Sequence, residues 1–267
     1  MYFADEPREA LAATGLRGFW MGYFAGRAAP MGTVGAAAVT ATFFNFHPDM
    51  VRRAIPDAWV LADRDAILEA RREGSVTALE RLVPDIAFRA TRIVPLLEGL
   101  IAATPEAGRP LFAANRALDP GDDPVGRFWQ AATTLREHRG DGHVAALTAV
   151  DLDGCEAHVL ASAWKGIPPD LLKPSRGWSD DDWQISSDRL RVRGWLDADG
   201  SLTPRGLEAR AELERHTDAL AWTVYRSLED NGDALVAALE PIGERVLAAR
   251  LIPFPNPIGL PGTPDKP

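Results

Sequence analysis

The sequence predicts a mainly α-helical fold with one short β-hairpin over residues 195–203. Ser179, followed three residues later by Asp182, forms a capping-box pattern that opens a helix, and Gly194 marks its end. The segment 195–203 holds Asp-Ala-Asp-Gly at its centre, which has the Asp-Gly chemistry of a tight hairpin turn. Pro204 is placed to open the next helix. Helix, hairpin and helix in this order form the second half of a winged helix-turn-helix.

Two short motifs frame this hairpin. Arg193-Gly194-Trp195 ends the predicted recognition helix, and Leu202-Thr203-Pro204-Arg205-Gly206 opens the helix after the hairpin. With these motifs the segment resembles the winged helix of MarR-type regulators, where an "RG-hydrophobe" end and an "LTxxG" start flank the wing. The resemblance implies a winged-helix fold, and a fold alone does not imply a function.

Further motifs extend the resemblance along the chain. They are GRAAPMG at 26–32, FFNFHP at 43–48, RGDGHVAAL at 139–147 and RGWLDADGSLT at 193–203. On these motifs the chain resembles an actinobacterial SalK-like family of helix-turn-helix proteins over nearly its full length. This resemblance implies the fold and names no activity.

A cluster of helix breakers predicts a domain boundary near the middle of the chain. Residues 119–124 read Asp-Pro-Gly-Asp-Asp-Pro, a strong linker signal. We therefore expect an N-terminal helical domain over 1–118, a winged-helix domain over 125–250 and a Pro-rich tail over 251–267. The N-terminal domain also holds several helices joined by tight turns, so a diverged duplicate of the winged-helix module is one interpretation of it.

The helical pattern predicts most of the remaining elements. Residues 5–28 are expected to form one helix, whose glycines at 15, 18, 22 and 26 permit close approach of another helix or of a ligand. Arg139–His143 is expected to be a turn, and 167–177 a Pro-rich loop. Other helices are expected over 33–44, 49–54, 62–72, 75–82, 84–104, 110–117, 125–138, 142–150, 155–165, 204–230 and 233–250.

The composition argues against several classes of protein. The net charge of −9 over 267 residues does not favour nucleic acid, because phosphate contacts need Lys and Arg. Cys155 is the only cysteine, so neither an intrachain disulfide nor a Cys-rich zinc site can form, and a buried inert thiol is expected. The N-terminus lacks the apolar core of a secretory signal, and no run of eighteen apolar residues occurs. We expect no membrane partner and a cytoplasmic location; the oligomeric state stays open, with a homodimer as one alternative.

Polar side chains at predicted helix ends form the candidate site. Aromatic walls with a few polar groups are typical of ligand pockets, and pockets favour domain interfaces. We therefore expect a cavity between the two halves of the chain. The catalytic candidates are His47, Asp141 and His143, and the ligand-binding candidates are Arg27, Phe43, Asn45, Phe46, His138 and Arg139. Arg27 would hold an anionic or carbonyl group, and the histidines would act as neutral ligands or proton carriers.

Structural alternatives stand beside these roles. Asp141 is as well explained as the N-cap of the following helix, and the helix dipole would keep His143 neutral in its first turn. His47 precedes a proline-started helix and is slightly better explained as a group that bonds its own turn. A metal site of two histidines and one carboxylate rests on residue types alone, and the sequence names no cofactor.

The charges of the predicted recognition helix argue against DNA binding. Its N-terminal part, Ser179–Trp183, carries three consecutive aspartates, and Asp197 and Asp199 add two more acids at the wing tip. These carboxylates would face phosphates, so DNA binding is expected to be absent or weak. The favoured hypothesis is a winged-helix scaffold that binds a small molecule, with an enzyme of bacterial secondary metabolism as one form of it. The alternative is a MarR-like, ligand-responsive transcriptional regulator that binds DNA.

Overall fold

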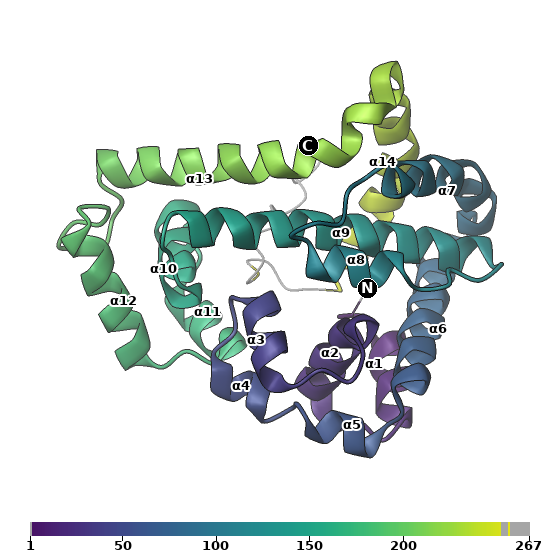
Figure 1. Cartoon of the computed structure of the whole chain (residues 1–267), viewed down its shortest axis with the longest axis horizontal. Coiled ribbons are helices and arrows are strands. Elements are labelled where there is room, and N and C mark those ends of the chain that lie inside the picture. The colour runs from purple at the N-terminus through teal and green to yellow at the C-terminus, as the bar shows by residue number, and fades with distance from the viewer. Residues whose placement is uncertain (1, 252–255, 257–267) are drawn as a thin grey trace. The chain divides into compact units, whose positions relative to one another are not determined.

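The computed structural model describes residues 2–251 and residue 256, and most of these residues are helical. Two compact units are present (Figure 1): unit 1 holds residues 2–35, 53–141 and 221–251, and unit 2 holds residues 36–52 and 142–220. The helices of unit 1 are α1 (Asp5–Ala13), α2 (Gly18–Ala28), η1 (Ala29–Met31), α5 (Asp57–Leu61), α6 (Arg64–Leu82), α7 (Ile86–Ala102), α8 (Pro110–Arg116), η2 (Thr223–Asn231) and α14 (Gly232–Ala248). Those of unit 2 are α3 (Ala36–Phe43), α4 (Pro48–Arg52), α10 (Gly154–Lys165), α11 (Pro169–Arg176) and α12 (Asp180–Val192). Helix α9 (Pro124–Ala149) runs from unit 1 into unit 2, and α13 (Pro204–Trp222) ends at their second junction.

The two units do not follow the order of the chain. The predicted boundary at 119–124 lies inside unit 1, and the units divide within α9, between Asp141 and Gly142. The breaker cluster instead caps α9, because the Asp123 side chain accepts the backbone N–H of Gly126 at 2.7 Å. A Pro- and Gly-rich segment signals a local turn, and only long-range contacts decide whether that turn separates two cores. The predicted tail at 251–267 lies outside the described residues, except for residues 251 and 256.

Glycines set the packing of the first helices in unit 1. The single helix expected over 5–28 is wrong: the chain turns between α1 and α2, where Gly15 and Gly18 adopt φ values of +102° and +69°. Such left-handed backbone is open to glycine without steric cost. Figure 1 shows α1 beside α6, and at Gly74 a Cβ would lie 2.4 Å from the Cα of Pro7. Within the predicted pattern, a Cβ at Gly22 or at Gly26 would lie 3.5 Å from the Leu11 side chain of α1, so these two glycines serve helix packing. Helix α6 continues through Gly74 instead of dividing into the two expected helices.

A larger apolar core fills the rest of unit 1. It joins α7, α9, η2 and α14, and its largest members are Phe112, Phe128 and Trp129. Helix α7 continues past Pro95, which lies on its exposed side. Among the described residues no helix combines the length and the apolar composition needed to cross a bilayer.

Unit 2 has its own core around α10, α12 and α13, built from residues such as Leu147, Leu160, Leu190 and Leu213. Both N-termini that matter here carry a full capping box, Asp153 with Glu156 at α10 and Ser179 with Asp182 at α12. The predicted start of α12 is therefore confirmed, and α10 begins one residue before the helix expected over 155–165. The loop expected over 167–177 is wrong, because Pro169 occupies the first turn of α11, where its missing N–H costs no hydrogen bond.

The predicted hairpin is reduced to a single antiparallel bridge between Leu196 and Leu202. The backbone N–H of Asp197 donates to Ser201 O, and that of Thr203 donates to Trp195 O, both at 3.0 Å. In the part of the chain that the structure describes, no sheet forms, because the segment between α12 and α13 allows too few residue pairs for a ladder.

Candidate functional site

The predicted site residues fall into both units, and each group is described within its own unit. Unit 1 holds Arg27, His138, Arg139 and Asp141, and unit 2 holds Phe43, Asn45, Phe46, His47 and His143. Their convergence on one cavity stays a prediction.

The expected turn at Arg139–His143 is wrong, since these residues lie in the middle of α9. Asp141 therefore does not cap its own helix, and His143 does not lie in a first helical turn. Asp141 caps a different helix: its Oδ2 accepts the backbone N–H of Phe112, in the first turn of α8, at 2.9 Å. Gly140 and Gly142 each cost the helix up to about 1 kcal/mol relative to alanine. The buried contacts of Glu137 and Asp141 in the same stretch of α9 offset that cost.

Arg27 and Glu137 form the central ion pair of unit 1. The Nε and Nη2 atoms of Arg27 donate to the two carboxylate oxygens of Glu137 at 2.9 and 2.8 Å. The Glu137 side chain is only 1% exposed. Burial raises the pKa of Glu137, but the charges of Arg27 and Arg136 outweigh it and hold that pKa at about 2. Burial likewise lowers the pKa of Arg27, but the charge of Glu137 raises it above its usual value.

Two further ionisable groups of α9 have displaced pKa values. Burial raises the pKa of Asp141 to about 6, against the N–H of Phe112, which lowers it. Burial and the nearby charge of Arg109 lower the pKa of His138 to about 4. The Nδ1 atom of His138 is buried and has no hydrogen-bond partner among the described residues. Displaced pKa values in one place are a feature of functional sites, although buried ion pairs produce them too.

Two buried charged residues of unit 1, Arg71 and Glu137, are not among the residues that the sequence pattern predicted for the site. Arg71 is 1% exposed, and its Nη atoms donate to Gly26 O at 3.1 Å, Gln130 Oε1 at 3.2 Å and Asn115 Oδ1 at 3.3 Å. The signal that points to this buried face is the spacing along α9. The buried polar residues of α9 are Gln130, Thr134, Glu137, His138 and Asp141, which recur at helical intervals on one side.

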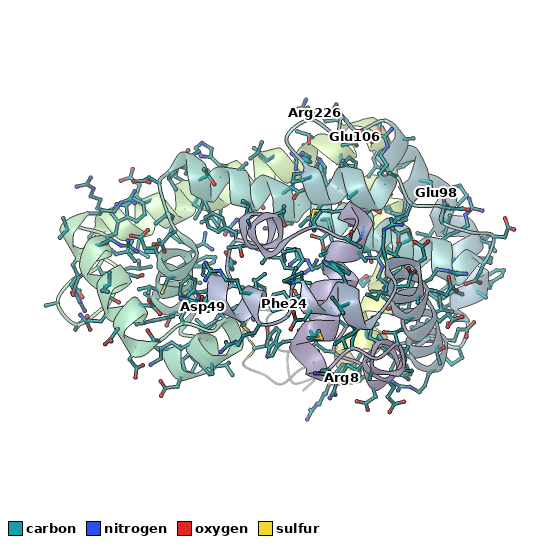
Figure 2. All side chains as sticks on the ribbon, turned by 60° about the horizontal axis from the view of Figure 1, so that its bottom comes forward. Arg8, Phe24, Asp49, Glu98, Glu106 and Arg226 are labelled. Atoms are coloured by element: carbon teal, nitrogen blue, oxygen red, sulfur yellow. The ribbon has the colours of Figure 1, made fainter. Side chains whose placement is uncertain are left out.

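A cavity of about 250 Å³ opens between α1 and α2 of unit 1. Figure 2 shows Arg8, one of its lining residues, on the outside of α1, and Phe24 in the interior of the same unit. The lining residues are Tyr2, Asp5, Arg8, Glu9, Leu11, Ala12, Gly18, Phe19, Gly22 and Tyr23. We call this space the α1–α2 cavity.

Aromatic rings form the walls of the α1–α2 cavity. Tyr2 meets Tyr23 edge-on with 5.5 Å between ring centroids, and the Arg8 guanidinium lies 5.8 Å from the centroid of Phe19. The hydroxyl of Tyr2 is buried and has no hydrogen-bond partner among the described residues. Arg27 reaches this wall, because its Nη1 donates to the Tyr23 hydroxyl at 3.5 Å. One predicted ligand-binding residue is thus connected to a cavity within its own unit.

In unit 2, Asn45 and His47 lie in the segment between α3 and α4, which hydrogen bonds to other parts of the unit hold in place. The backbone carbonyl of Asn45 meets Nε2 of His158 and accepts from Nε1 of Trp178, both at 3.1 Å. Nδ1 of His47 accepts the N–H of Asp49 at 3.1 Å, so this histidine bonds the first turn of α4. A Cβ on Gly154 would lie 2.2 Å from Phe44 O, which shows how closely α10 approaches the segment. These contacts explain why residues 36–52 belong to unit 2.

The aromatic candidates and His143 also have structural neighbours. Phe43 and Phe46 are buried, and the guanidinium of Arg176 lies 4.9 Å from the ring centroid of Phe46. Nδ1 of His143 lies 2.9 Å from Oγ1 of Thr217 on α13, and that hydroxyl in turn donates to Leu213 O. In the described part of the chain, no group of three His, Cys, Asp or Glu side chains lies close enough together to hold a metal ion.

The exposed face of α12 is acidic and apolar. Its exposed side chains are Asp180, Asp181, Gln184, Ile185, Asp188, Arg189 and Val192. Ile185 is 56% and Val192 is 89% exposed. Residues 142–220 hold 14 Asp and Glu against nine Lys and Arg, a net charge of −5. The helix that would read DNA therefore presents a face that phosphates repel.

The arginines at the end of α12 have partners within unit 2. Arg189 pairs with Asp153 and, at 3.2 Å, with Glu156. Arg191 pairs with Asp188 at 2.7 Å. Arg193 donates to the carbonyls of Val150 and Asp151, and its guanidinium lies 4.0 Å from the ring centroid of Trp195. Arg189 and Arg193 therefore hold α12 on its neighbours, and the pair of Arg191 with Asp188 lies within α12.

The architecture is that of a helix-turn-helix scaffold: both units are helical, α12 begins with a capping box, and a short turn leads into α13. Residues 1–253 match the helix-turn-helix family, and the chain belongs to that family. No curated protein and no solved structure shows a significant match to the chain. The family membership fits a scaffold of the kind that DNA-binding proteins use.

Proposed function

We propose that this chain uses its helix-turn-helix scaffold to bind a small planar aromatic molecule in the α1–α2 cavity of unit 1. The observation that carries the proposal is a cavity of about 250 Å³ with aromatic walls and the hydroxyl of Tyr2, which has no hydrogen-bond partner in the described part of the chain. Apolar walls with a few polar groups are the usual composition of a ligand site, and leaving a buried hydroxyl unbonded costs about 1–3 kcal/mol. A ligand that bonds the Tyr2 hydroxyl would remove that cost.

The chemistry of the lining indicates the class of ligand. Phe19 and Tyr23 offer ring faces and edges. A Cβ added at Gly18 would meet no atom of the described residues within 4 Å beyond its chain neighbours and its own helix backbone, so space remains beside them. The Tyr2 hydroxyl calls for a hydrogen-bond acceptor on the ligand. Arg27 is held by Glu137 and donates to the Tyr23 hydroxyl, and this contact restrains the Tyr23 side of the wall. A rigid, preformed wall lowers the entropy lost on binding.

DNA reading is the second candidate, and the family membership is the observation that favours it. Against it stand the exposed aspartates Asp181 and Asp188 on α12 and the engagement of its arginines with neighbouring groups. A ligand-responsive regulator would combine both functions. Because the exposed face of α12 is acidic and its arginines are paired, the proposal predicts binding of an aromatic molecule and little affinity for duplex DNA at physiological salt.

The experiment measures fluorescence anisotropy of 7-hydroxycoumarin, a planar aromatic probe, on titration with the whole protein. Ala12 lines the cavity and is exposed on α1, so Ala12→Phe is expected to fill the cavity and to weaken probe binding by at least about ten-fold, equivalent to 1.4 kcal/mol. The matched control is Ala13→Phe, which adds the same side chain at the neighbouring exposed position outside the lining.

Each outcome bears on the proposal. Saturable binding that Ala12→Phe weakens and Ala13→Phe leaves unchanged supports it. Absence of saturable binding, or an equal effect of both substitutions, overturns the cavity as the site. A parallel titration of labelled duplex DNA tests the second candidate, and tight sequence-specific binding there would replace the proposal with a DNA-reading function.

A further inference from the structure

A second cavity lies between α7 and α14 of unit 1, and its lining differs from that of the α1–α2 cavity. It measures about 250 Å³ and is lined by Asp85, Phe88, Arg89, Arg92, Ile93 and Ala238. Figure 1 shows α7 and α14 next to each other, and the two helices share the larger core of the unit. We call this space the α7–α14 cavity.

The rim of the α7–α14 cavity carries an excess of positive charge. The carboxylate of Asp85 pairs with Arg89 at 2.8 Å and with Arg245 at 2.7 Å. The hydrogen bond from Arg89 is the largest cause that lowers the pKa of the Asp85 carboxyl, and a backbone hydrogen bond and the charges of Arg245 and Arg89 lower it further. Arg92 is the second arginine of the cavity lining, beside Arg89. The lining therefore holds two arginines against one carboxylate, and that carboxylate is also paired with Arg245 of α14.

Arg92 is the arginine left for a ligand. Its guanidinium lies 5.3 Å from the ring centroid of Phe88, one helical turn earlier on α7. Among the described residues Arg92 has no hydrogen bond or ion pair. A guanidinium stacked on a ring uses its face for the stacking, and its N–H groups at the edge can still bind a carboxylate through two parallel hydrogen bonds.

Phe88 gives the site its apolar wall. Its side chain is 66% exposed, although it adjoins a cavity whose floor includes the buried Ile93. A ligand ring stacked on Phe88 would remove this apolar surface from water.

We propose that the α7–α14 cavity binds a small aromatic carboxylate. The carboxylate lies in the plane of the Arg92 guanidinium, and the ring packs on Phe88 and Ile93. Arg89 and Arg245 are engaged by Asp85 and supply a positive field without direct bonds. This site is independent of the α1–α2 cavity and does not rest on the proposed function.

The test is ligand-observed NMR titration of the whole protein with benzoate, and with benzamide as its uncharged counterpart. A dissociation constant of about 1 mM is ordinary for a ligand this small. Arg92→Gln and Phe88→Ala are each expected to raise that constant at least about ten-fold, and Arg92→Lys, which keeps the charge but loses the planar fork, to raise it less. Benzamide should bind the unaltered protein at least about ten-fold more weakly than benzoate.

The matched control is Arg226→Gln, labelled in Figure 2, which removes one exposed arginine of η2 outside the cavity lining. Unchanged benzoate binding in this variant supports a defined site. The proposal is overturned by any of three results: no saturable benzoate binding, equal affinity for benzamide, or an equal loss in Arg226→Gln and Arg92→Gln. Retained binding in Phe88→Ala would overturn the placement of the ring.

Discussion

Glu137→Gln tests whether the buried pair with Arg27 holds unit 1 together. The substitution keeps the shape of the side chain and removes its charge, so the Arg27 guanidinium stays buried opposite a neutral amide. Arg27 is 9% exposed and cannot recover the lost interaction from water without local opening. Breaking a buried ion pair from one side leaves an uncompensated buried charge, which typically costs 3–5 kcal/mol.

The pKa of Glu137 gives an independent magnitude. It falls from 4.5 to about 2, because the charges of Arg27 and Arg136 outweigh burial. One pKa step corresponds to about 1.4 kcal/mol, so the ionised carboxylate stabilises the fold by about 3 kcal/mol. This lowered pKa fixes the sign of the pH dependence: the contribution is complete above pH 4.5 and is lost as the pH falls toward 2.

Urea unfolding at neutral pH, followed by circular dichroism, measures the free energy of unfolding. The matched control is Glu98→Gln, because Glu98 (Figure 2) makes the same two-bond contact with Arg127 at 3.0 and 2.6 Å but is 32% exposed. Exposed pairs contribute about 0–1 kcal/mol. Two results would refute the reasoning. One is a loss of unfolding free energy in Glu137→Gln no larger than that in Glu98→Gln. The other is a decrease of stability between pH 4.5 and 2 that is the same in Glu137→Gln as in the unaltered protein.

Three further outcomes follow from the structure. Gly206→Ala should destabilise the protein by about 1–3 kcal/mol in urea unfolding, since its Cβ would lie 2.0 Å from Trp195 O; a neutral effect would contradict the packing. Cys155, with a pKa raised by burial to about 11, should react with a thiol reagent only in urea, and prompt reaction of the folded protein would show that it is accessible. The ring of His158, with a pKa lowered by burial to about 3, should show no NMR titration between about pH 7 and 5, and a midpoint near 6.5 would place it in contact with water.

Local signals predicted many of the elements correctly. The capping pattern at Ser179 and the proline at 204 fixed the start of α12 and α13, because a cap or a proline acts within one helical turn. The burial of Cys155 also followed from its apolar surroundings. The small-residue spacing in the first helices predicted close packing, since it depends only on the size of the side chains.

Long-range contacts decided what the sequence left open. The glycines at 140 and 142 read as a turn, yet α9 continues through them because Glu137 and Asp141 find partners far away in sequence. Asp141 caps α8 instead of its own helix, which no local pattern can indicate.

The sequence by itself determined the helical class, the capped α12 and the acidic character of its N-terminal turn, all of which depend on neighbouring residues. Only the tertiary structure decided the composition of the units and the cavity walls. Residues 36–52 join unit 2 through contacts such as that of the Asn45 carbonyl with His158, over a hundred positions away. The cost of closing so long a loop is independent of local sequence, and the contacts that offset it appear only when the chain is folded.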